Sequence, residues 1–525
     1  TYSVGRVQTP TLGMVCERYW ENKRFELKPF WQVHFGVVDT DSGNILKFTS
    51  VNRWTDKATA TDIYNKVKET GSVIITKVAT KRKVEKAPLL YDLTTLQKEA
   101  NSQHGFTAEH TLYIAQKLYE AKFITYPRTS SRYISDDVFA TLPKLFKNLE
   151  NHSEYGEKVK LLPGSEDYSK NSVNAAKVTD HHALLITENA AIGLFKDEKI
   201  VYDMILCRMI EAFSADCIKD ITSVTAQVDH EVEFGISGSI IRQTGWRALS
   251  LKEKNKRQDK DADATDNEVK DQVIPNWQEG QHITFSGCTI TEGKTKPKPL
   301  HTEATLLSAM ETAGKDIEDD ALRQALKDCG IGTPATRAAI IETLFKRGYM
   351  ERCKKSLVPT EKGLALYSVV KTMRIADVAM TGEWEKNLAR IERGELPADT
   401  FRREIEAYTR EITSELLSCD KLFSRRDSGC KCPKCGTGSM QFYGKVVRCD
   451  NAECGLPVFR LKANRTLSDD EIKELLTDGH TKLLKGFKSK QGKSFDAIVA
   501  FDGDYNTTFV FPERKTSRKF SGRKK

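Results

Sequence analysis

A tyrosine with arginines close by marks the stretch Phe123-Ile-Thr-Tyr-Pro-Arg-Thr-Ser-Ser-Arg-Tyr133 as a place for phosphate chemistry. Pro127 restricts Tyr126 to extended or turn conformations, so Tyr126 is expected to close a structured segment. A phenol near cations is suited to attack on a phosphodiester, because Arg128 can stabilise the charge that develops on the phosphate. The usual pKa of tyrosine is about 10, so the hydroxyl needs help to act as a nucleophile at neutral pH. The string alone is equally compatible with an ordinary structural tyrosine.

Two adjacent histidines occur in Thr179-Asp-His-His-Ala-Leu-Leu-Ile-Thr187, in a chain with only 10 histidines. Adjacent residues point in different directions, so at most one of His181 and His182 is expected to face a given site. On the string alone, a pair of histidines at the surface or at the edge of a core is the simpler interpretation.

Two close pairs of cysteines, Cys432-Pro-Lys-Cys435 and Cys449-Asp-Asn-Ala-Glu-Cys454, predict a zinc site. This spacing can place four thiolates tetrahedrally around Zn²⁺, which leaves no open position and predicts a structural metal. A redox Cys-x-x-Cys is the alternative, and the second pair disfavours it. Cys430 could compete as a ligand. The residues between the pairs mix aromatics with cations and predict stacking on unpaired bases: Gln441, Phe442, Tyr443, Lys445 and Arg448.

Length and composition predict a soluble protein of several domains. The chain has 525 residues, of which 39% are hydrophobic and 30% charged, and its net charge is +9. This length predicts about three to five domains, and local basic clusters matter more than the modest net charge for a polyanion partner. No stretch approaches the roughly 20 apolar residues of a membrane span, so we expect no membrane partner and a cytoplasmic location. The other cysteines are scattered singly, which is typical of a reducing compartment.

The elements that must position these residues follow from periodicity and turn signals. Residues 31–85 predict strand, turn, strand, helix and strand, and residues 215–295 return to β character. Residues 89–214 are mainly helical. Within them a helix at 107–121 is expected to begin at a Thr107 cap and to bury Leu112, Ala115, Leu118 and Tyr119. The charged run at 252–270 is expected to be a solvated loop.

Helical and basic character returns from residue 296 onward. One helix is expected from about residue 301, and another after Gly330-Ile-Gly-Thr-Pro-Ala-Thr-Arg337, with a Thr333 cap. Lys346 and Arg347 end that second helix, and a β wing is expected to follow; a helix pair with a wing is a recurring way to hold DNA. Arg337 is expected either to contact DNA or to fix its loop. The tail at 514–525 carries seven basic residues and is expected to be disordered and to bind phosphates.

Three strings together, Leu89-Leu-Tyr-Asp-Leu-Thr-Thr-Leu-Gln-Lys-Glu-Ala100, Ile114-Ala-Gln-Lys-Leu-Tyr-Glu120 and Phe123-Ile-Thr-Tyr-Pro-Arg-Thr129, resemble the active-site domain of type IA DNA topoisomerases, most closely bacterial topoisomerase III. The resemblance implies that Tyr126 attacks one DNA strand and joins its 5′ phosphate, and that Arg128 contacts this phosphate. The family has a matching His-His-Ala string, which implies that His181 positions the phosphate or relays a proton, with His182 as a DNA contact. Ser130 stands where the family usually has Asp, which affects only a supporting hydrogen bond.

The opening string Ser3-Val-Gly-Arg-Val-Gln-Thr-Pro-Thr-Leu12 resembles the family's strand-binding segment and implies that Arg6 and Gln8 contact the DNA backbone. In the family this string follows a Toprim domain that supplies an acid residue and the Mg²⁺-binding carboxylates. Because the chain opens directly in this motif at Thr1, we expect it to be a fragment of a longer polypeptide that lacks the Toprim domain.

The resemblance implies a multidomain α+β fold with a type IA topoisomerase core and a C-terminal zinc ribbon. The two β segments would join into one arch around a hole that DNA passes through, with the helical active-site domain inserted at its tip. The expected parts are the start of the strand-binding domain at 1–27, the β arch at 28–88 and 215–295, the active-site domain at 89–214, the winged-helix domain at 296–412, the zinc ribbon at 413–462, a small C-terminal module at 463–513 and the basic tail at 514–525.

The implied reaction is cleavage, strand passage and religation of single-stranded DNA. It needs no ATP, and the chain contains no Gly-rich Lys-Ser/Thr phosphate loop. A helicase is a further expected partner. One alternative is a fragment that binds single strands without cleaving them, because the Toprim domain is absent. A tyrosine recombinase is the other alternative, disfavoured because Tyr126 precedes His181 by 55 positions, whereas such a tyrosine would normally come last.

Overall fold

The computed structural model divides into two compact units, residues 1–406 and 407–525. It describes residues 2–40, 42–152, 155–189, 191, 193–229, 231–249, 272–315, 330–417, 426–443, 446–489 and 492–511. The charged run at 252–270, the basic tail at 514–525 and Lys445 therefore lie outside the described residues. No helix among the described residues is long and apolar enough to span a membrane.

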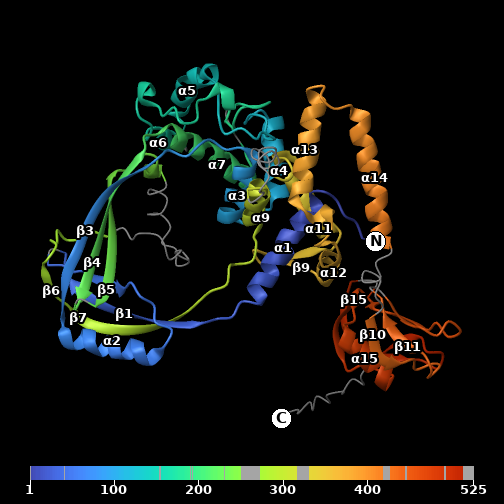
Figure 1. The fold of residues 1–525 in the computed structure, drawn as a ribbon. Coiled ribbons are helices and arrows are strands. Elements are labelled where there is room, and N and C mark those ends of the chain that lie inside the picture. Colours follow the sequence, from blue (N-terminus) through green and yellow to red (C-terminus); the bar gives the residue numbers. More distant parts are fainter. Residues whose placement is uncertain are drawn as a thin grey trace, which may run out of the picture. The chain divides into compact units, whose positions relative to one another are not determined.

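Both predicted β segments contribute to one antiparallel sheet of the first unit (Figure 1), as expected. Its strand order among the described residues is β6-β3-β4-β5-β2-β1-β7. Alternating apolar side chains such as Val33, Phe35 and Phe48 form the core of this sheet. Helix α2 (Lys57–Thr70) packs on the sheet at β1 and β7. The strands are β1 (Pro29–Val38), β2 (Ile45–Ser50), β3 (Ser72–Glu85), β4 (Cys217–Val228), β5 (Val232–Gln243), β6 (His282–Thr284) and β7 (Ser286–Lys294).

The helical segment is inserted between β3 and β4. Glu85 pairs with Cys217 where these two long strands end, so the chain leaves the sheet and re-enters it at one place (Figure 1). Helix α3 begins at an Asp92 cap and ends at Gly105 in the left-handed conformation, and α4 begins at the predicted Thr107 cap. The inserted helices share one apolar core: α3 (Leu93–His104), α4 (Ala108–Glu120), α5 (Asp136–Leu149), α6 (Gly156–Val159) and α7 (Lys196–Phe213). The segment also contains the 3₁₀ turns η1 (Ser165–Asp167) and η2 (Ala175–Lys177).

Helix α1 (Gln8–Lys23) packs on elements from a distant part of the chain, including α9, α11, α12 and β9. It begins two residues before Pro10 and ends at Lys23. The predicted helices and β wing are present, with Thr333 as the cap of α11. These elements are α9 (Glu303–Thr312), α11 (Pro334–Lys346), β8 (Met350–Cys353), β9 (Ser356–Pro359), α12 (Glu361–Val370), η3 (Arg374–Ala376), α13 (Val378–Glu392) and α14 (Ala398–Leu417).

The described residues of the second unit share one apolar core. Cys432 and Val447 of the cysteine-bearing strands belong to the same cluster as Leu475 and Phe487, on the other side of the predicted division at residue 462. Its elements are β10 (Arg426–Lys431), β11 (Ser439–Phe442), β12 (Val446–Cys449), β13 (Pro457–Phe459), β14 (Leu461–Lys462), β15 (Arg465–Thr466), α15 (Asp469–Asp478), β16 (Leu484–Lys488), β17 (Ser494–Phe501) and β18 (Thr507–Val510). The eight-part division of the chain remains a prediction.

Candidate active site

The segment before Tyr126 pairs with the segment that follows the two histidines. Ile124 and Ile186 form an antiparallel bridge, the Thr125 N–H donates to the Leu185 carbonyl at 2.9 Å, and the Thr187 N–H donates to the Phe123 carbonyl at 3.0 Å. Both isoleucines are buried. This ladder joins two pieces of chain about 60 residues apart and holds them in a defined register.

The register brings His181 against Tyr126. Their ring centroids are 4.5 Å apart and the ring planes are inclined by 50°. The Thr129 hydroxyl donates to the His181 carbonyl at 2.9 Å, which fixes the histidine backbone to the turn after the tyrosine. Tyr126 is half-buried and His181 is exposed. A phenol and an imidazole in contact at the surface can share a phosphate or a proton.

Tyr119, in the last turn of α4, completes the surroundings of the Tyr126 ring. Its ring meets that of Tyr126 edge to face, with centroids 5.3 Å apart. The prediction that Tyr119 belongs to the buried side of the helix was wrong, because this side chain is exposed, and Leu112 is only half-buried. Ile114 instead joins Ala115 and Leu118 on the buried side. Tyr119 therefore packs on the candidate nucleophile rather than in the core.

Arg128 is exposed and has no hydrogen-bond or ion-pair partner within the part of the chain that the structure describes. Pro127 and Thr129 on either side of it are buried, so the backbone is anchored while the guanidinium is left to solvent. Ser130, which replaces the usual family aspartate, lies 3.1 Å from the Thr179 hydroxyl. The hydroxyl thus still links the tyrosine turn to the histidine segment.

The two histidines point in different directions, as their adjacency predicts. His182 Nδ1 lies 2.7 Å from the Ala183 carbonyl oxygen. His181, in contrast, contacts Tyr126. Only His181 is therefore shown in contact with the candidate nucleophile.

A buried charged cluster supports the helices beneath this turn. Arg208 of α7 pairs with Glu99 of α3 at 2.6 Å and lies 4.1 Å from the centroid of the Tyr91 ring. Burial raises the pKa of Tyr91 well above its usual value, so its phenol stays protonated and donates to Glu99 at 2.5 Å. The Leu184 N–H donates to the Tyr91 carbonyl at 2.8 Å, which connects this cluster to the histidine segment.

Arg6 and Gln8 lie at the start of α1, against the winged-helix elements. Arg6 forms a 2.7 Å ion pair with Glu385 and contacts the Trp384 ring, and its side chain is 33% exposed. The Gln8 amide donates to the Ser3 carbonyl at 3.3 Å. The structure describes no contact between these residues and Tyr126.

Arg337 is 1% exposed, and its guanidinium donates to the Thr94 hydroxyl at 3.0 Å and to the Ile331 carbonyl at 3.3 Å. A buried guanidinium with these partners supports the loop-fixing alternative over a direct contact with DNA. Lys346 and Arg347 are exposed, and Lys346 lies 3.8 Å from Glu109 of α4. These two cations remain available to a polyanion.

The four predicted zinc ligands converge in the second unit. The sulfur atoms of Cys432, Cys435, Cys449 and Cys454 all lie within 4.8 Å of one another. Hydrogen bonds from the backbone, first from Gly438, lower the pKa of Cys435 to about 6, whereas burial raises the pKa of Cys432 and raises that of Cys449 to about 12. A bound cation favours the thiolate form of all four. Cys430 is not part of the group, and its sulfur lies 3.8 Å from the Thr477 hydroxyl. Four sulfur donors at this separation fit a closed tetrahedral zinc site.

The expected stacking surface between the cysteine pairs is smaller than the sequence indicates. Phe442 is 6% exposed and Gln441 is 8% exposed, so both belong to the core of the second unit. The predicted role of Phe442 in base stacking was therefore wrong. Tyr443, just after β11, and Arg448 of β12 are exposed.

Residues 1–403 match the family described as DNA topoisomerase, and residues 453–512 match the C-terminal repeat of topoisomerase. The chain belongs to the type IA DNA topoisomerase family. Within the family it is close to topoisomerase III, as the resemblance of its motifs predicted.

Two curated relatives illustrate this closeness. A DNA topoisomerase 3 of Bacillus cereus is 36% identical over 471 residues, which cover 86% of this chain and 62% of the relative. DNA topoisomerase 3 of Bacillus subtilis (strain 168) is 32% identical over 470 residues with the same coverage. The chain thus spans 62% of the length of these relatives.

A solved structure, full-length topoisomerase I from Thermotoga maritima, has a similar fold. The TM-score is 0.61 at 24% sequence identity, and the match covers 90% of this chain and 71% of that one. At this identity the similarity concerns the fold alone. It agrees with the multidomain α+β architecture expected from the sequence.

Proposed function

We infer that this chain carries the strand-cleaving tyrosine of an ATP-independent, topoisomerase III-like enzyme that cleaves, passes and religates single-stranded DNA. The observation that carries the proposal is the contact between the rings of Tyr126 and His181. Two residues from the tyrosine, Arg128 is exposed and has no partner among the described residues. The names of the curated relatives support the same reaction class.

The reaction is two transesterifications. The Tyr126 oxygen attacks a backbone phosphorus atom, the bond from phosphorus to the 3′ oxygen breaks, and the phenol becomes joined to the 5′ phosphate. The phenolic proton leaves and the 3′ oxygen takes up a proton. After strand passage the 3′ hydroxyl attacks the phosphotyrosine and restores both groups. The bond energy is kept in the protein link, so ATP is not required.

Each residue of the site has a separate role in this proposal. Arg128 contacts the phosphate and stabilises the charge that develops on its oxygens, and His181 positions the phosphate or relays the proton. Tyr119 holds the Tyr126 ring in place through its edge contact.

The remaining DNA contacts are assigned to exposed or half-buried side chains away from the tyrosine. Arg6 would exchange Glu385 for a backbone phosphate, and Gln8, His182, Lys346 and Arg347 would contact the strand. A preference for single strands and a helicase partner belong to the same proposal.

Two metals have different places in the proposal. Zn²⁺ is held by Cys432, Cys435, Cys449 and Cys454, and it supplies structure to the second unit. Mg²⁺ belongs to the Toprim domain that the family resemblance implies. The cysteine group is the one set of three or more metal-ligating side chains found among the described residues.

The alternative, a fragment that binds single strands without cleaving them, is not favoured by the relatives' names. A covalent-adduct assay separates the two. Single-stranded DNA is incubated with the chain, with and without a supplied Toprim segment and Mg²⁺, and protein-linked DNA is measured on a denaturing gel. The proposal predicts an adduct with Tyr126 that disappears in Tyr126→Phe. DNA binding without any adduct under all conditions would support the non-cleaving alternative.

A further inference from the structure

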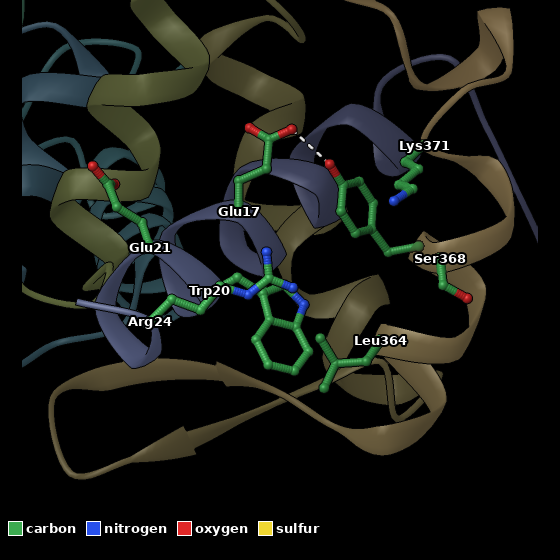
Figure 2. Close-up of a pocket in the computed structure, with 8 residues that line it drawn as sticks. Glu17, Trp20, Glu21, Arg24, Leu364, Ser368 and Lys371 are labelled. Carbon is green, nitrogen blue, oxygen red and sulfur yellow. Dashed lines mark hydrogen bonds between the residues drawn. The ribbon is translucent and has the colours of Figure 1, made fainter. Parts of the chain in front are cut away.

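A cavity of about 500 Å³ lies between α1 and α12, on the side of α1 that carries Trp20 and Arg24 (Figure 2). From α12 it is lined by Leu364, Tyr367 and Ser368, with Lys371 just beyond the helix. None of these residues has a part in the site built around Tyr126.

The wall between the two helices is closely packed. A side chain carbon added at Gly13 would lie 3.2 Å from Tyr367 Cε2, so glycine at this position lets α1 and α12 approach. The Tyr367 hydroxyl donates to Glu17 at 2.6 Å (Figure 2), and burial together with this carboxylate raises the pKa of the phenol well above its usual value. The phenol therefore remains a donor, and one carboxylate of the cavity is already engaged.

Trp20 is an indole left partly open to solvent. It is 38% exposed, and the Arg24 guanidinium lies 4.8 Å from its ring centroid. Arg24 and the edge-on ring of Tyr19 cover part of the indole, and the part left open is suited to a flat partner. A nucleobase is such a partner, because any base can stack on an aromatic side chain.

The charge of the cavity favours an anion beside that flat partner. Arg24 and Lys371 are both exposed, and neither has an ion-pair partner in the described part of the chain. The second carboxylate, Glu21, is neutralised by Lys298 at 2.7 Å and by Arg18 at 3.1 Å. Glu21 is thus neutralised by cations and Glu17 is hydrogen-bonded to a neutral phenol. Arg24 and Lys371, in contrast, have no ion-pair partner among the described residues and can bind an anion.

We propose that this cavity binds one nucleotide of a single DNA strand, with the base against Trp20 and the phosphate at Arg24 and Lys371. The inference rests on the proposed function, since a strand-cleaving enzyme must hold the strand on both sides of the cut. It assigns α1 a second DNA contact, about four helical turns beyond Arg6, and makes α12 part of the strand-binding surface. A free mononucleotide offers the same base and phosphate, and the experiment below distinguishes it from a DNA strand.

The test uses the full chain carrying Tyr126→Phe, so that binding is measured without cleavage. Fluorescence anisotropy with labelled dT20 gives the Kd. Trp20→Ala is expected to raise the Kd about 5- to 100-fold, the range measured for loss of one stacked base, whereas Trp20→Phe stays close to the parent. On an abasic strand of the same length, parent and Trp20→Ala should bind alike.

A pair of charge variants at Ser368 covers the case in which Trp20→Ala fails to fold. Ser368 is exposed at the rim, so Ser368→Glu and Ser368→Lys leave the packing intact. Ser368→Glu is expected to weaken dT20 binding several-fold and Ser368→Lys to strengthen it, with the difference reduced by salt. Equal affinity of the two variants would overturn the phosphate assignment.

A second cavity of about 390 Å³ provides the matched control. It also has an exposed aromatic ring, Tyr113, beneath a lysine, but that lysine, Lys117, already pairs with Glu198 at 3.4 Å. Trp20→Ala should weaken dT20 binding more than Tyr113→Ala does.

Three outcomes would overturn the inference. They are an unchanged Kd in a folded Trp20→Ala protein, equal losses in Trp20→Ala and Tyr113→Ala, or binding of dTMP at Trp20 while dT20 affinity is unaffected. The adduct assay for Tyr126 in the otherwise unsubstituted chain does not depend on these variants. Failure of the cavity and failure of the proposed reaction are therefore distinguishable.

Discussion

The ring of His181 lies 4.5 Å from that of Tyr126, and the Thr129 hydroxyl holds the histidine carbonyl at 2.9 Å. A histidine held in this position can take part in the reaction of the tyrosine hydroxyl. His182, in contrast, is hydrogen-bonded to the Ala183 carbonyl.

The first prediction concerns these two histidines. His181→Ala should lower the rate of adduct formation by about 100-fold, within the range for a positioned acid, base or phosphate ligand. His182→Ala should lower it much less. Single-turnover adduct formation at saturating DNA measures both rates, and equal losses in the two variants would contradict the assignment.

The second prediction concerns the buried Arg337. Arg337→Ala should reduce the free energy of unfolding of the first unit by about 2–4 kcal/mol, because it removes the hydrogen bonds to Thr94 and Ile331 and leaves a cavity beside Thr94. Denaturant unfolding measures this loss. Lys346→Ala, on the exposed end of the same helix, should change stability by less than about 0.5 kcal/mol. A stable Arg337→Ala protein would exclude the loop-fixing role.

These residues also show what the sequence could and could not predict. The caps Thr107 and Thr333 and the alternating strand residues act locally, so helices and strands could be placed from them. Arg337 follows the cap by four residues, and the same local pattern is compatible with an exposed or a buried side chain. Its burial depends on Thr94, which lies 243 positions away.

The candidate site has the same limit. Tyr126 and His181 are 55 positions apart, and no periodicity relates them; only the family resemblance brought them together before the structure did. Tyr119 has the spacing of a core residue, yet the helix turns it toward Tyr126. Phe442 lies in an aromatic and basic stretch, but the pairing of its strand directs it into the core. Tertiary contacts decided each of these cases.

The third prediction concerns the cysteine centre. The chain should bind one Zn²⁺, and Cys454→Ser should lose the metal and unfold the second unit, because Cys432 and Cys449 are part of its only described core cluster. Cys430→Ser should keep both metal and fold, since its sulfur lies outside the group. Elemental analysis and thermal unfolding check the pair, and loss of zinc from Cys430→Ser would contradict the ligand set.

The fourth prediction concerns acid stability. Burial lowers the pKa of His34 and of His301 to about 4, below the usual value near 6.5. As the pH falls below about 6.5, these histidines become protonated in the unfolded chain but stay neutral in the folded chain. The free energy of unfolding is therefore highest above about pH 6.5 and decreases as the pH falls toward 4.

His34→Gln isolates one of the two groups. The free energy of unfolding of the parent protein should fall between pH 7.5 and pH 4.5, and in His34→Gln this fall should be smaller by about 1–2 kcal/mol. Urea unfolding of both proteins at the two pH values measures this difference. A parent protein that is equally stable at both pH values would contradict the prediction.

The most direct test of the central claim is to locate the protein–DNA bond. The adduct formed with a supplied Toprim segment and Mg²⁺ is trapped by denaturation, digested with protease and nuclease, and sequenced by mass spectrometry. The account predicts a nucleotide joined through its 5′ phosphate to Tyr126, and to no other residue of this chain. A nucleotide on a different side chain, or one joined through its 3′ phosphate, would contradict it.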